Sequence, residues 1–337
     1  VLDTSSTLIP LNTTIGRIEF RTASQKLVQF NLYYETGSGL SPIQAYVYAE
    51  VPMGQGVYIW NDYNENGVKE LEEFEVSAFS YEANYIRIPI QTTEYQNVFN
   101  SSLTTSLNIQ FSNKKFWRNE GLHELMKPWS ISLQNRSESR TNRSEFRLYP
   151  IAVINDSIWL GYTNAQRGGI YFNRGNPRFS VDLIFSRNEN KSQMLSGFES
   201  KEDRGGQLTA RTTLKSFWNV LCALDYGKKI SASNFLTIRN YAYSFLTIKP
   251  ALIFQPTAKK QFGLNSEFGL KNGGNSETQF ESTSLSVSGL IQWEISDGQL
   301  FKTEIKWTSI ALNGALTGSA LYDALNGLQV GNNMQYQ

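Results

Sequence analysis

Apolar and polar residues alternate with a period of two along most of the chain from Leu103 onward. In the segment 103–112, Leu107 and Ile109 share a face with Leu103, while serine, threonine, asparagine and glutamine fill the other face. Side chains of a β-strand point alternately to its two faces, so this pattern predicts strands with one apolar and one polar face. The segment 284–296 repeats the pattern, with serine facing away from leucine, valine, isoleucine and tryptophan.

About twelve strands of this kind are predicted after residue 100. They lie near 103–112, 129–138, 145–154, 158–164, 170–187, 207–214, 218–226, 243–254, 261–271, 284–296, 299–311 and from 333 onward. Several are longer than the strands of about five or six residues that are typical of soluble proteins, and they match the roughly 9–11 residues that cross a bilayer. Aromatic residues stand near many strand ends, as they do in the interfacial girdles of membrane barrels.

The connections between these strands differ in length in a regular way. Long connections are predicted at 113–128, 188–206, 227–242, 272–283 and 312–332, and short ones at 215–219, 255–260 and 297–298. Outer-membrane barrels have long external loops and short internal turns. The pattern therefore predicts an antiparallel transmembrane β-barrel over residues 101–337.

Two other all-β architectures produce a similar alternation. A soluble β-sandwich remains an alternative, although its strands are usually shorter, and a β-solenoid would show a fixed repeat period that this chain lacks. The last predicted strand begins near 333 and stops at Gln337. An open sheet edge in lipid leaves unpaired backbone groups that cost several kcal/mol each, so we expect the protein to continue or another chain to close the seam.

The first hundred residues have a different pattern. Shorter, half-buried strands are predicted at 17–21, 28–34, 44–51 and 57–60. We expect a small β-rich domain over residues 1–100 that precedes the barrel. If the strand at 103–112 rises from the inner to the outer side of the membrane, this domain lies in the periplasm.

The segment DYNENGVKELEE (62–73) matches the calcium-loop pattern D-x-[DN]-x-[DN]-G-x5-E. Calcium takes about six to eight oxygen ligands, and Gly67 permits the sharp turn that such a loop needs at its sixth position. The predicted ligands are the side chains of Asp62, Asn64, Asn66 and Glu73, the backbone carbonyl of Val68 and, through a water, Glu70. A strand precedes the loop, so we expect one EF-hand-like site with a structural calcium; an Asn/Gly turn without an ion is the alternative.

Composition excludes several classes of function. The 31 Lys and Arg residues balance 30 Asp and Glu residues, so no charge excess predicts binding to nucleic acid. The chain has one cysteine, Cys222, and one histidine, His123, which excludes intrachain disulfides and argues against histidine-dependent triads. We expect no enzymatic activity. The sequence starts at Val1 without a signal peptide, and we expect a mature or partial form of a longer protein.

Four stretches carry a resemblance to a known group of proteins. They are GQGVYIWNDYNENGVKELEEFEVSAFSYEANYIRIPIQTTEYQNVF (54–99), FNRGNPRFSVDL (172–183) with SGFES (196–200), and ALYDALNGLQVGNNMQYQ (320–337). These resemble the C-terminal barrel region of large, uncharacterised outer-membrane proteins of the Bacteroidota. The resemblance implies an outer-membrane barrel of fourteen strands, two of them beyond the C-terminus of this chain, and it implies no activity.

These observations predict a non-enzymatic barrel of the bacterial outer membrane that acts as a structural or accessory subunit of a secretion, assembly or surface complex. The expected partners are the lipid bilayer and other outer-membrane or periplasmic subunits. A diffusion or substrate-uptake channel is the alternative, and a membrane-embedded enzyme such as a lipase or protease is a third possibility.

Overall fold

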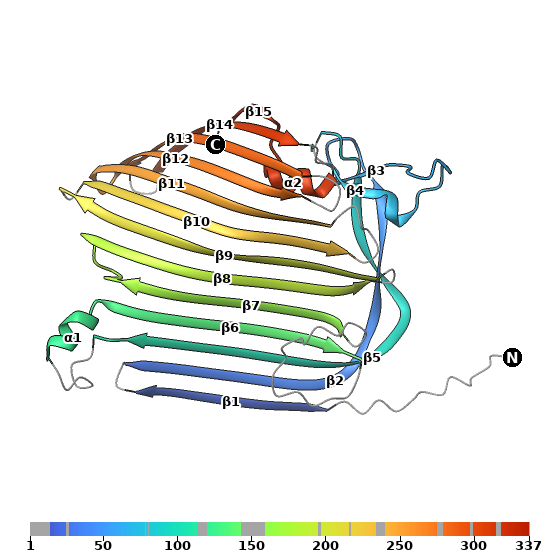
Figure 1. Cartoon of the computed structure of the whole chain (residues 1–337), viewed down its shortest axis with the longest axis horizontal. Helices are drawn as coiled ribbons and strands as arrows, with labels where there is room; N and C mark the ends of the chain where they lie inside the picture. The colour runs from blue at the N-terminus through green and yellow to red at the C-terminus, as the bar shows by residue number, and fades with distance from the viewer. Residues whose placement is uncertain are drawn as a thin grey trace.

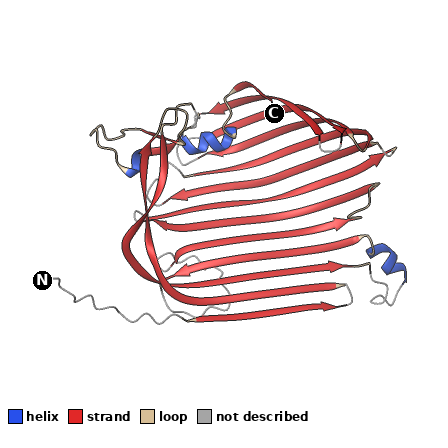
Figure 2. Ribbon diagram, turned by 180° about the vertical axis from the view of Figure 1, so that it is seen from behind, coloured by secondary structure: helices blue, strands red, loops and turns tan. Residues whose placement is uncertain are grey.

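β-Strands make up most of the chain in the computed structural model (Figure 1 and Figure 2). The structure describes residues 14–24, 27–77, 79, 81–112, 120–142, 159–194, 197–215, 217–233, 240–274, 279–296, 299–314 and 318–336. The strands are β1 (Ile15–Ser24), β2 (Val28–Glu50), β3 (Tyr58–Trp60), β4 (Phe74–Val76), β5 (Tyr85–Gln110), β6 (Trp129–Thr141), β7 (Trp159–Phe172), β8 (Phe179–Met194), β9 (Gly197–Leu214), β10 (Trp218–Ser233), β11 (Tyr241–Thr257), β12 (Lys260–Gly274), β13 (Gln279–Ser296), β14 (Gln299–Gly314) and β15 (Gly331–Tyr336). The helices are η1 (Leu71–Glu73), α1 (Glu120–Met126) and α2 (Gly318–Leu325). Within the described part of the chain, none of them is long and apolar enough to span a bilayer.

Thirteen strands form one antiparallel sheet in the order β1-β2-β5-β6-β7-β8-β9-β10-β11-β12-β13-β14-β15, and β3 and β4 attach beside β5. Apart from β3 and β4, each strand pairs with the next strand along the chain, so the sheet is a meander. The predicted all-β, antiparallel class is confirmed. The sheet is not closed: β1 and β15 are its two edges among the described residues, so the structure has an open sheet where the sequence predicts a barrel.

The strand boundaries differ from the predicted ones in the middle of the chain. Residues 170–187, predicted as one strand, are divided by a turn between β7 and β8, where Asn173 (φ 55°) and Gly175 (φ 86°) adopt left-handed backbone conformations. The predicted connection 188–206 is mostly strand, because β8 and β9 remain paired as far as Met194 and Gly197. The predicted strand 145–154 lies outside the described residues.

The N-terminal strands belong to the large sheet. β1 pairs with the first half of β2, which in turn pairs with residues 95–109 of β5. Residues 100 and 101, between which the sequence predicts a domain boundary, are consecutive residues of β5. Beyond a register shift between Pro42 and Gln44, the far half of β2 pairs with residues 85–91. We call residues 44–91, which include β3 and β4, the arm; it extends from one end of the sheet (Figure 1).

The two ends of the sheet carry different structures. At the arm-side end lie the arm and α2, which contacts β4. At the opposite end, which we call the far end, lie α1 and three places where one strand ends within a few residues of the start of the next, between β9 and β10, β11 and β12, and β13 and β14. The link that contains α1, residues 111–128, is therefore at the opposite end from the α2 link. The sequence predicts both links on the same side, because its pattern indicates one strand more between residues 129 and 187 than the direct β6–β7–β8 pairing contains.

One face of the sheet, which we call the outer face, carries the large apolar side chains. A row of directly paired positions crosses the sheet from β5 to β13 and is apolar throughout: Ile109, Ile131, Ile170, Leu183, Leu208, Leu224, Ile248, Phe268 and Leu285. Many of these side chains are exposed, Phe268 by 44% and Leu285 by 43%. The opposite, inner face has small, buried polar residues such as Ser180, Thr247 and Ser286. This arrangement is the reverse of a water-soluble sheet packed on a core.

Glycines under aromatic rings occur on the inner face. A Cβ atom at Gly227 would lie 2.6 Å from Cζ of Phe245 on the neighbouring strand, and one at Gly169 would overlap the ring of Tyr171. Each ring occupies the space that a side chain at the glycine would need. Glycines at such positions allow a sheet to bend, and here they favour curvature toward the inner face.

Candidate metal centre and apolar outer face

The predicted calcium loop closes the hairpin of β3 and β4 within the arm. Trp60 pairs with Phe74 across the hairpin, and the backbone N–H of Asn61 donates to the carbonyl of Glu73 at 2.9 Å. In an EF-hand sensor a helix stands on each side of the calcium loop. Here the strand β3 precedes the loop and the short helix η1 forms its end. The pairing holds the first and last residues of 62–73 next to each other.

The first half of the loop folds around the carboxylate of Asp62. Its Oδ2 accepts a hydrogen bond from the N–H of Gly67 at 2.8 Å, and its Oδ1 accepts one from the N–H of Asn66 at 3.2 Å. Gly67 has φ +70°, and no atom lies within 4 Å of the position of a Cβ there. The backbone conformation rather than space therefore requires glycine at this position.

The polar side chains in the middle of the loop lie together. Glu70 accepts hydrogen bonds from the amide of Asn64 at 3.0 Å and from the amide of Asn66 at 3.3 Å. The Oδ1 atom of Asn66 accepts from the N–H of Val68 at 2.6 Å, while the Val68 side chain is exposed. The structure thus brings Asp62, Asn64, Asn66 and Glu70 together on one turn.

Glu73, the predicted bidentate ligand, is the most buried residue of the loop at 2% exposure. Its Oε2 accepts hydrogen bonds from Trp60 Nε1 at 2.8 Å and from the N–H of Glu70 at 3.3 Å. Its Oε1 is buried and has no hydrogen-bond partner among the described residues. A buried carboxylate oxygen without a partner is costly, and a bound cation would satisfy it.

The residues of the loop fit a hard divalent cation. No cluster of three or more His, Cys, Asp or Glu residues able to hold a metal occurs among the described residues. The predicted site does not need one, because two of its six ligands are asparagine side chains and one is a backbone carbonyl. The unsatisfied oxygen of Glu73 is the structural feature that supports a cation here.

Lys69 links the loop to the strands β2 and β5 of the arm, and the sequence did not predict this role. Its Nζ lies 3.2 Å from Glu50 Oε2, which also accepts a hydrogen bond from the Tyr85 hydroxyl at 3.2 Å. The ammonium group also lies over the rings of Tyr85, at 5.0 Å, and Trp60, at 5.7 Å. Hydrogen bonds from Lys69 and Tyr85 hold the pKa of Glu50 below its ordinary value.

An aromatic cluster supports the arm beneath this ion pair. Phe74 stacks on Tyr48 with ring centroids 4.1 Å apart, and Tyr85 packs edge-on against Phe74 at 5.0 Å. Phe74 and Tyr85 are each only 4% exposed. The arm therefore has a small core of the ordinary kind, with its aromatic side chains inside.

Helix α2 folds over the inner face at the arm-side end. Leu321 packs against the buried cluster of Tyr241, Tyr243 and Phe280. The hydroxyl of Tyr241 donates to Asp323, and Lys271 donates to the Asp323 carbonyl at 3.2 Å. These contacts cover part of the inner face with the chain's own residues.

The apolar band of the outer face has distinct limits at both ends. At the far end it stops at clustered aromatic rings, with Trp129 and Phe172 5.0 Å apart and Trp218 and Phe254 4.6 Å apart. Toward the arm it stops at a row of directly paired polar residues that crosses the sheet from β5 to β14. This row consists of Thr105, Asn135, Gln166, Arg187, Arg204, Lys228, Ser244, Asn272, Glu281 and Asn313.

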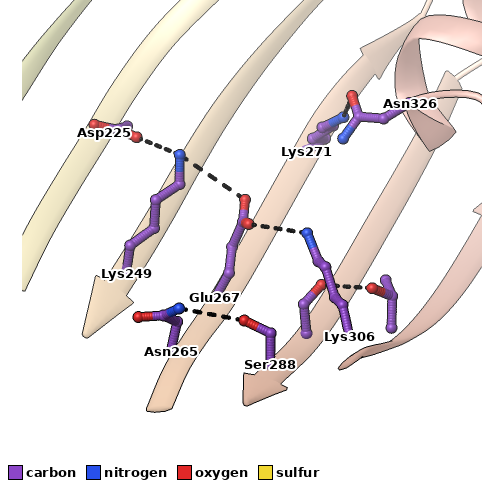
Figure 3. A network of polar contacts seen from close by, with 10 residues as sticks. Asp225, Lys249, Asn265, Glu267, Lys271, Ser288, Lys306 and Asn326 are labelled. Carbon is purple, nitrogen blue, oxygen red and sulfur yellow. Dashed lines mark hydrogen bonds and ion pairs between the residues drawn. The ribbon is translucent and has the colours of Figure 1, made fainter. Parts of the chain in front are cut away.

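A ladder of alternating charges crosses the inner face (Figure 3). Lys249 Nζ lies 2.8 Å from Asp225 and 3.9 Å from Glu267, and Lys306 Nζ lies 3.9 Å from the other oxygen of Glu267. These residues come from β10, β11, β12 and β14. Charges that are paired across strands but half exposed are typical of a surface in contact with water.

His123 lies in α1, and Cys222 lies on β10. His123 is 4% exposed in α1; its Nε2 lies 3.3 Å from the carbonyl of Ser112, and its Nδ1 lies 3.6 Å from Glu124. Cys222 is exposed and pairs with Ala210 and Pro250 on the neighbouring strands.

Comparisons with protein-family models, with curated proteins and with solved structures found no match to this chain. Two structural features are therefore the basis for inferring its function. They are the metal loop at the tip of the arm, and a sheet whose apolar side chains face outward.

Proposed function

We propose that this chain is a non-enzymatic β-barrel protein of the bacterial outer membrane, which acts as a structural or accessory subunit of a secretion, assembly or surface complex of the cell envelope. The observation that carries the proposal is the exposed apolar band on the outer face. Water is a poor solvent for such a surface, because each Leu, Ile or Phe side chain gains about 1.5–3 kcal/mol when it leaves water. Lipid provides the apolar environment.

The dimensions of the band support contact with a bilayer. On β13 the outward apolar positions extend from Leu285 to Ile295. Ten residue steps span about 33 Å along a strand, which at a tilt of about 40° becomes about 25 Å along the membrane normal. The apolar band of outer-membrane barrels is about 25 Å tall.

Closure of the sheet follows from the same proposal, because an open edge in lipid leaves backbone groups unpaired. The edge strands β1 and β15 run in the same direction, since an even number of antiparallel pairings separates them. An antiparallel barrel then requires an odd number of further strands between them. One such strand gives a total of fourteen, with β1 and β2 as members of the barrel, whereas the resemblance implies fourteen with two strands beyond the C-terminus of this chain.

The topology changes the expected position of the arm. The arm and the α2 link share one end of the sheet, while most links at the far end are short. In outer-membrane barrels the long connections face the outside and the short turns face the periplasm. We therefore place the arm and its metal loop outside the cell, in place of the periplasmic position expected from the sequence.

In this proposal the metal loop holds a structural calcium ion through Asp62, Asn64, Asn66, Val68, Glu70 and Glu73. The ion would offset most of the negative charge of the three ligand carboxylates, Asp62, Glu70 and Glu73. The unsatisfied Oε1 of Glu73 supports this assignment. Since Glu73 directly precedes β4, a cation at this carboxylate ties the loop to the aromatic cluster of the arm.

Fluorescence quenching by brominated lipids tests the membrane proposal. Variants that retain one tryptophan each, Trp293 or Trp60, are folded into vesicles with bromine on the acyl chains. We expect strong quenching of Trp293, which is 45% exposed on the outer face, and little quenching of Trp60 in the arm. Equal quenching of the two would contradict the proposal.

A channel is the second candidate, and the charge ladder on the inner face favours it. A water-filled interior lined by Lys249, Glu267 and Lys306 would conduct ions. The cover provided by α2 over the inner face argues for low conductance in the intact chain. Planar-bilayer recordings decide: a large, steady conductance identifies a channel, whereas no conductance together with co-purifying envelope proteins identifies an accessory subunit.

A further inference from the structure

A group of basic residues lies on the outer face next to the apolar band, on β8, β9 and β10. Arg187 pairs directly with Arg204, and Arg204 pairs directly with Lys228, so three cations stand side by side. Lys191 points to the same face, since it lies an even number of residues from Arg187 on β8. We call these four residues the outer basic cluster.

Carboxylates balance only part of this charge. Glu202 Oε1 lies 3.0 Å from Arg187 and 3.8 Å from Arg204, and Glu189 lies 3.3 Å from Arg187. Like charges on directly paired positions repel each other. Among the described residues of these strands, the three directly paired cations Arg187, Arg204 and Lys228 share their face with two carboxylates, so they keep an excess of positive charge. Arg187 and Arg204 remain 46% and 53% exposed.

The positions directly adjacent to the cluster are apolar. Phe185 pairs with Gly206, which pairs with Tyr226, and this row lies immediately on the far-end side of Arg187, Arg204 and Lys228. Phe185 is 52% exposed and Tyr226 is 62% exposed. A ligand that contacts both rows needs an anionic group next to an apolar chain.

We propose that the outer basic cluster binds the phosphate-bearing head groups of lipids in the leaflet on the arm side. This inference rests on the proposed membrane location. Arginine presents planar N–H groups that match phosphate oxygens, and lysine adds a mobile charge. The head group contacts the cations while its acyl chains lie along Phe185 and Tyr226. A free phosphate ion would use the cations alone.

Lipid selectivity in vesicles tests the inference. The chain is folded into phosphatidylcholine vesicles that contain a trace of spin-labelled phosphatidylglycerol or spin-labelled phosphatidylcholine, and the fraction of label immobilised by the protein gives the relative association constant. We expect the wild type to prefer phosphatidylglycerol, and Arg204→Gln with Lys228→Gln to reduce that preference by about fivefold for each cation removed.

A matched control lies on the same strands. Lys201 and Lys229 belong to β9 and β10 but sit an odd number of residues from Arg204 and Lys228, on the inner face. The variant Lys201→Gln with Lys229→Gln changes the net charge equally and should keep the preference. Equal losses in the two variants would show a nonspecific charge effect and would overturn the inference.

Two further arms separate the remaining outcomes. Millimolar inorganic phosphate should leave the preference unchanged relative to chloride at the same ionic strength; if phosphate abolishes it, the cluster is a free-anion site and the inference fails. Insertion is measured separately by protease protection of the strands in pure phosphatidylcholine. Protection without lipid preference defeats this inference alone, whereas loss of protection in all vesicles defeats the proposed membrane location.

Discussion

Aromatic residues are buried in the arm but exposed on the outer face of the sheet. In the arm, Phe74 and Tyr85 are 4% exposed and pack against each other. On the outer face, Phe185 is 52% exposed and Trp293 is 45% exposed. Both regions are antiparallel β-structure with alternating side chains, so secondary structure does not cause the difference.

Under the proposed membrane location, the two regions face different solvents. The arm hides its apolar side chains and presents carboxylates, amides and Lys69 outward, as a structure in water does. The sheet presents a band of apolar side chains outward and carries a ladder of paired charges on its inner face. A single chain that does both is expected to lie partly in lipid and partly in water, and four predictions test this contrast.

The largest effect is expected from Phe74→Ala in the arm. Removing a fully buried aromatic side chain costs about 3–5 kcal/mol, because its contacts and the surrounding packing are lost. Hydrogen exchange should show the amides of residues 44–50 losing protection while β10–β13 keep theirs. Phe74→Leu serves as the control and should cost less than about 1.5 kcal/mol. A uniform loss of protection in both regions would show that the arm and the sheet unfold as one unit.

A charge in the middle of the apolar band should have the next largest effect. Leu264→Lys places an ammonium group on the outer face, at a position that is 53% exposed in the protein alone. In a bilayer this substitution should cost about 2–4 kcal/mol, whereas an exposed site in water would change by about 0.5 kcal/mol or less. Urea unfolding from vesicles measures the change.

The control for this charge is the neighbouring residue on the opposite face. Asn265→Lys adds the same group on the inner face, next to Ser288, and should have little effect. If Leu264→Lys is as mild as Asn265→Lys, the outer face does not contact lipid.

Calcium should stabilise the arm by a smaller amount. External calcium-binding modules have dissociation constants of about 10⁻⁴–10⁻³ M, so 10 mM calcium should stabilise the arm by about 1.4–2.7 kcal/mol. Limited proteolysis of residues 54–80 with and without chelator measures the effect. Asp62→Ala should abolish it, and Tyr63→Ala, which changes an exposed position between predicted ligands, should keep it. If the cleavage rate changes neither with calcium nor with the substitution Asp62→Ala, the loop is not a metal site.

The smallest effect is expected from pH, through the ion pair of Glu50 with Lys69. The pKa of Glu50 is lowered from its ordinary value of 4.5 by hydrogen bonds from Lys69 and Tyr85. A carboxylate with a lowered pKa stabilises the folded state above its ordinary pKa, and this contribution is lost as the pH falls through the folded value. Proteolysis of the arm should therefore quicken modestly below about pH 4.5. In Glu50→Gln the arm should be less protected at neutral pH and show a weaker pH dependence.

The proximity of the candidate metal ligands was predictable from the sequence. The contacts that attach the loop to β2 and β5 were not. Asp62, Asn64, Asn66, Glu70 and Glu73 lie within one short turn, so their sequence spacing nearly determines their proximity. Glu50 and Tyr85 reach the loop only because β2 and β5 pair along the arm. No local pattern reveals such a pairing, since Lys69 in the sequence looks like any solvated lysine.

For the strands, too, local features were predictable and long-range pairing was not. Alternation from Leu103 onward predicted the strands and their two faces, because a side chain's direction follows from its own position in the strand. It did not predict that Val28 pairs with Ile109, or that residues 170–187 turn at Asn173. The extra strand predicted between residues 129 and 187 also put the arm and the α2 link at opposite ends of the sheet, because each added strand reverses the direction of the strands after it. In the structure the arm and the α2 link share one end (Figure 1).

The sequence by itself determined that this protein is all-β, with strands that separate apolar from polar side chains, and it placed the candidate metal ligands on one loop. These properties depend on neighbouring residues, so local periodicity specifies them. Only the tertiary structure decided that β1 and β2 extend the sheet, that the arm and α2 share an end, and that three cations meet beside the apolar band. Those features depend on pairing and direction between distant strands, where many partners offer similar alternating patterns.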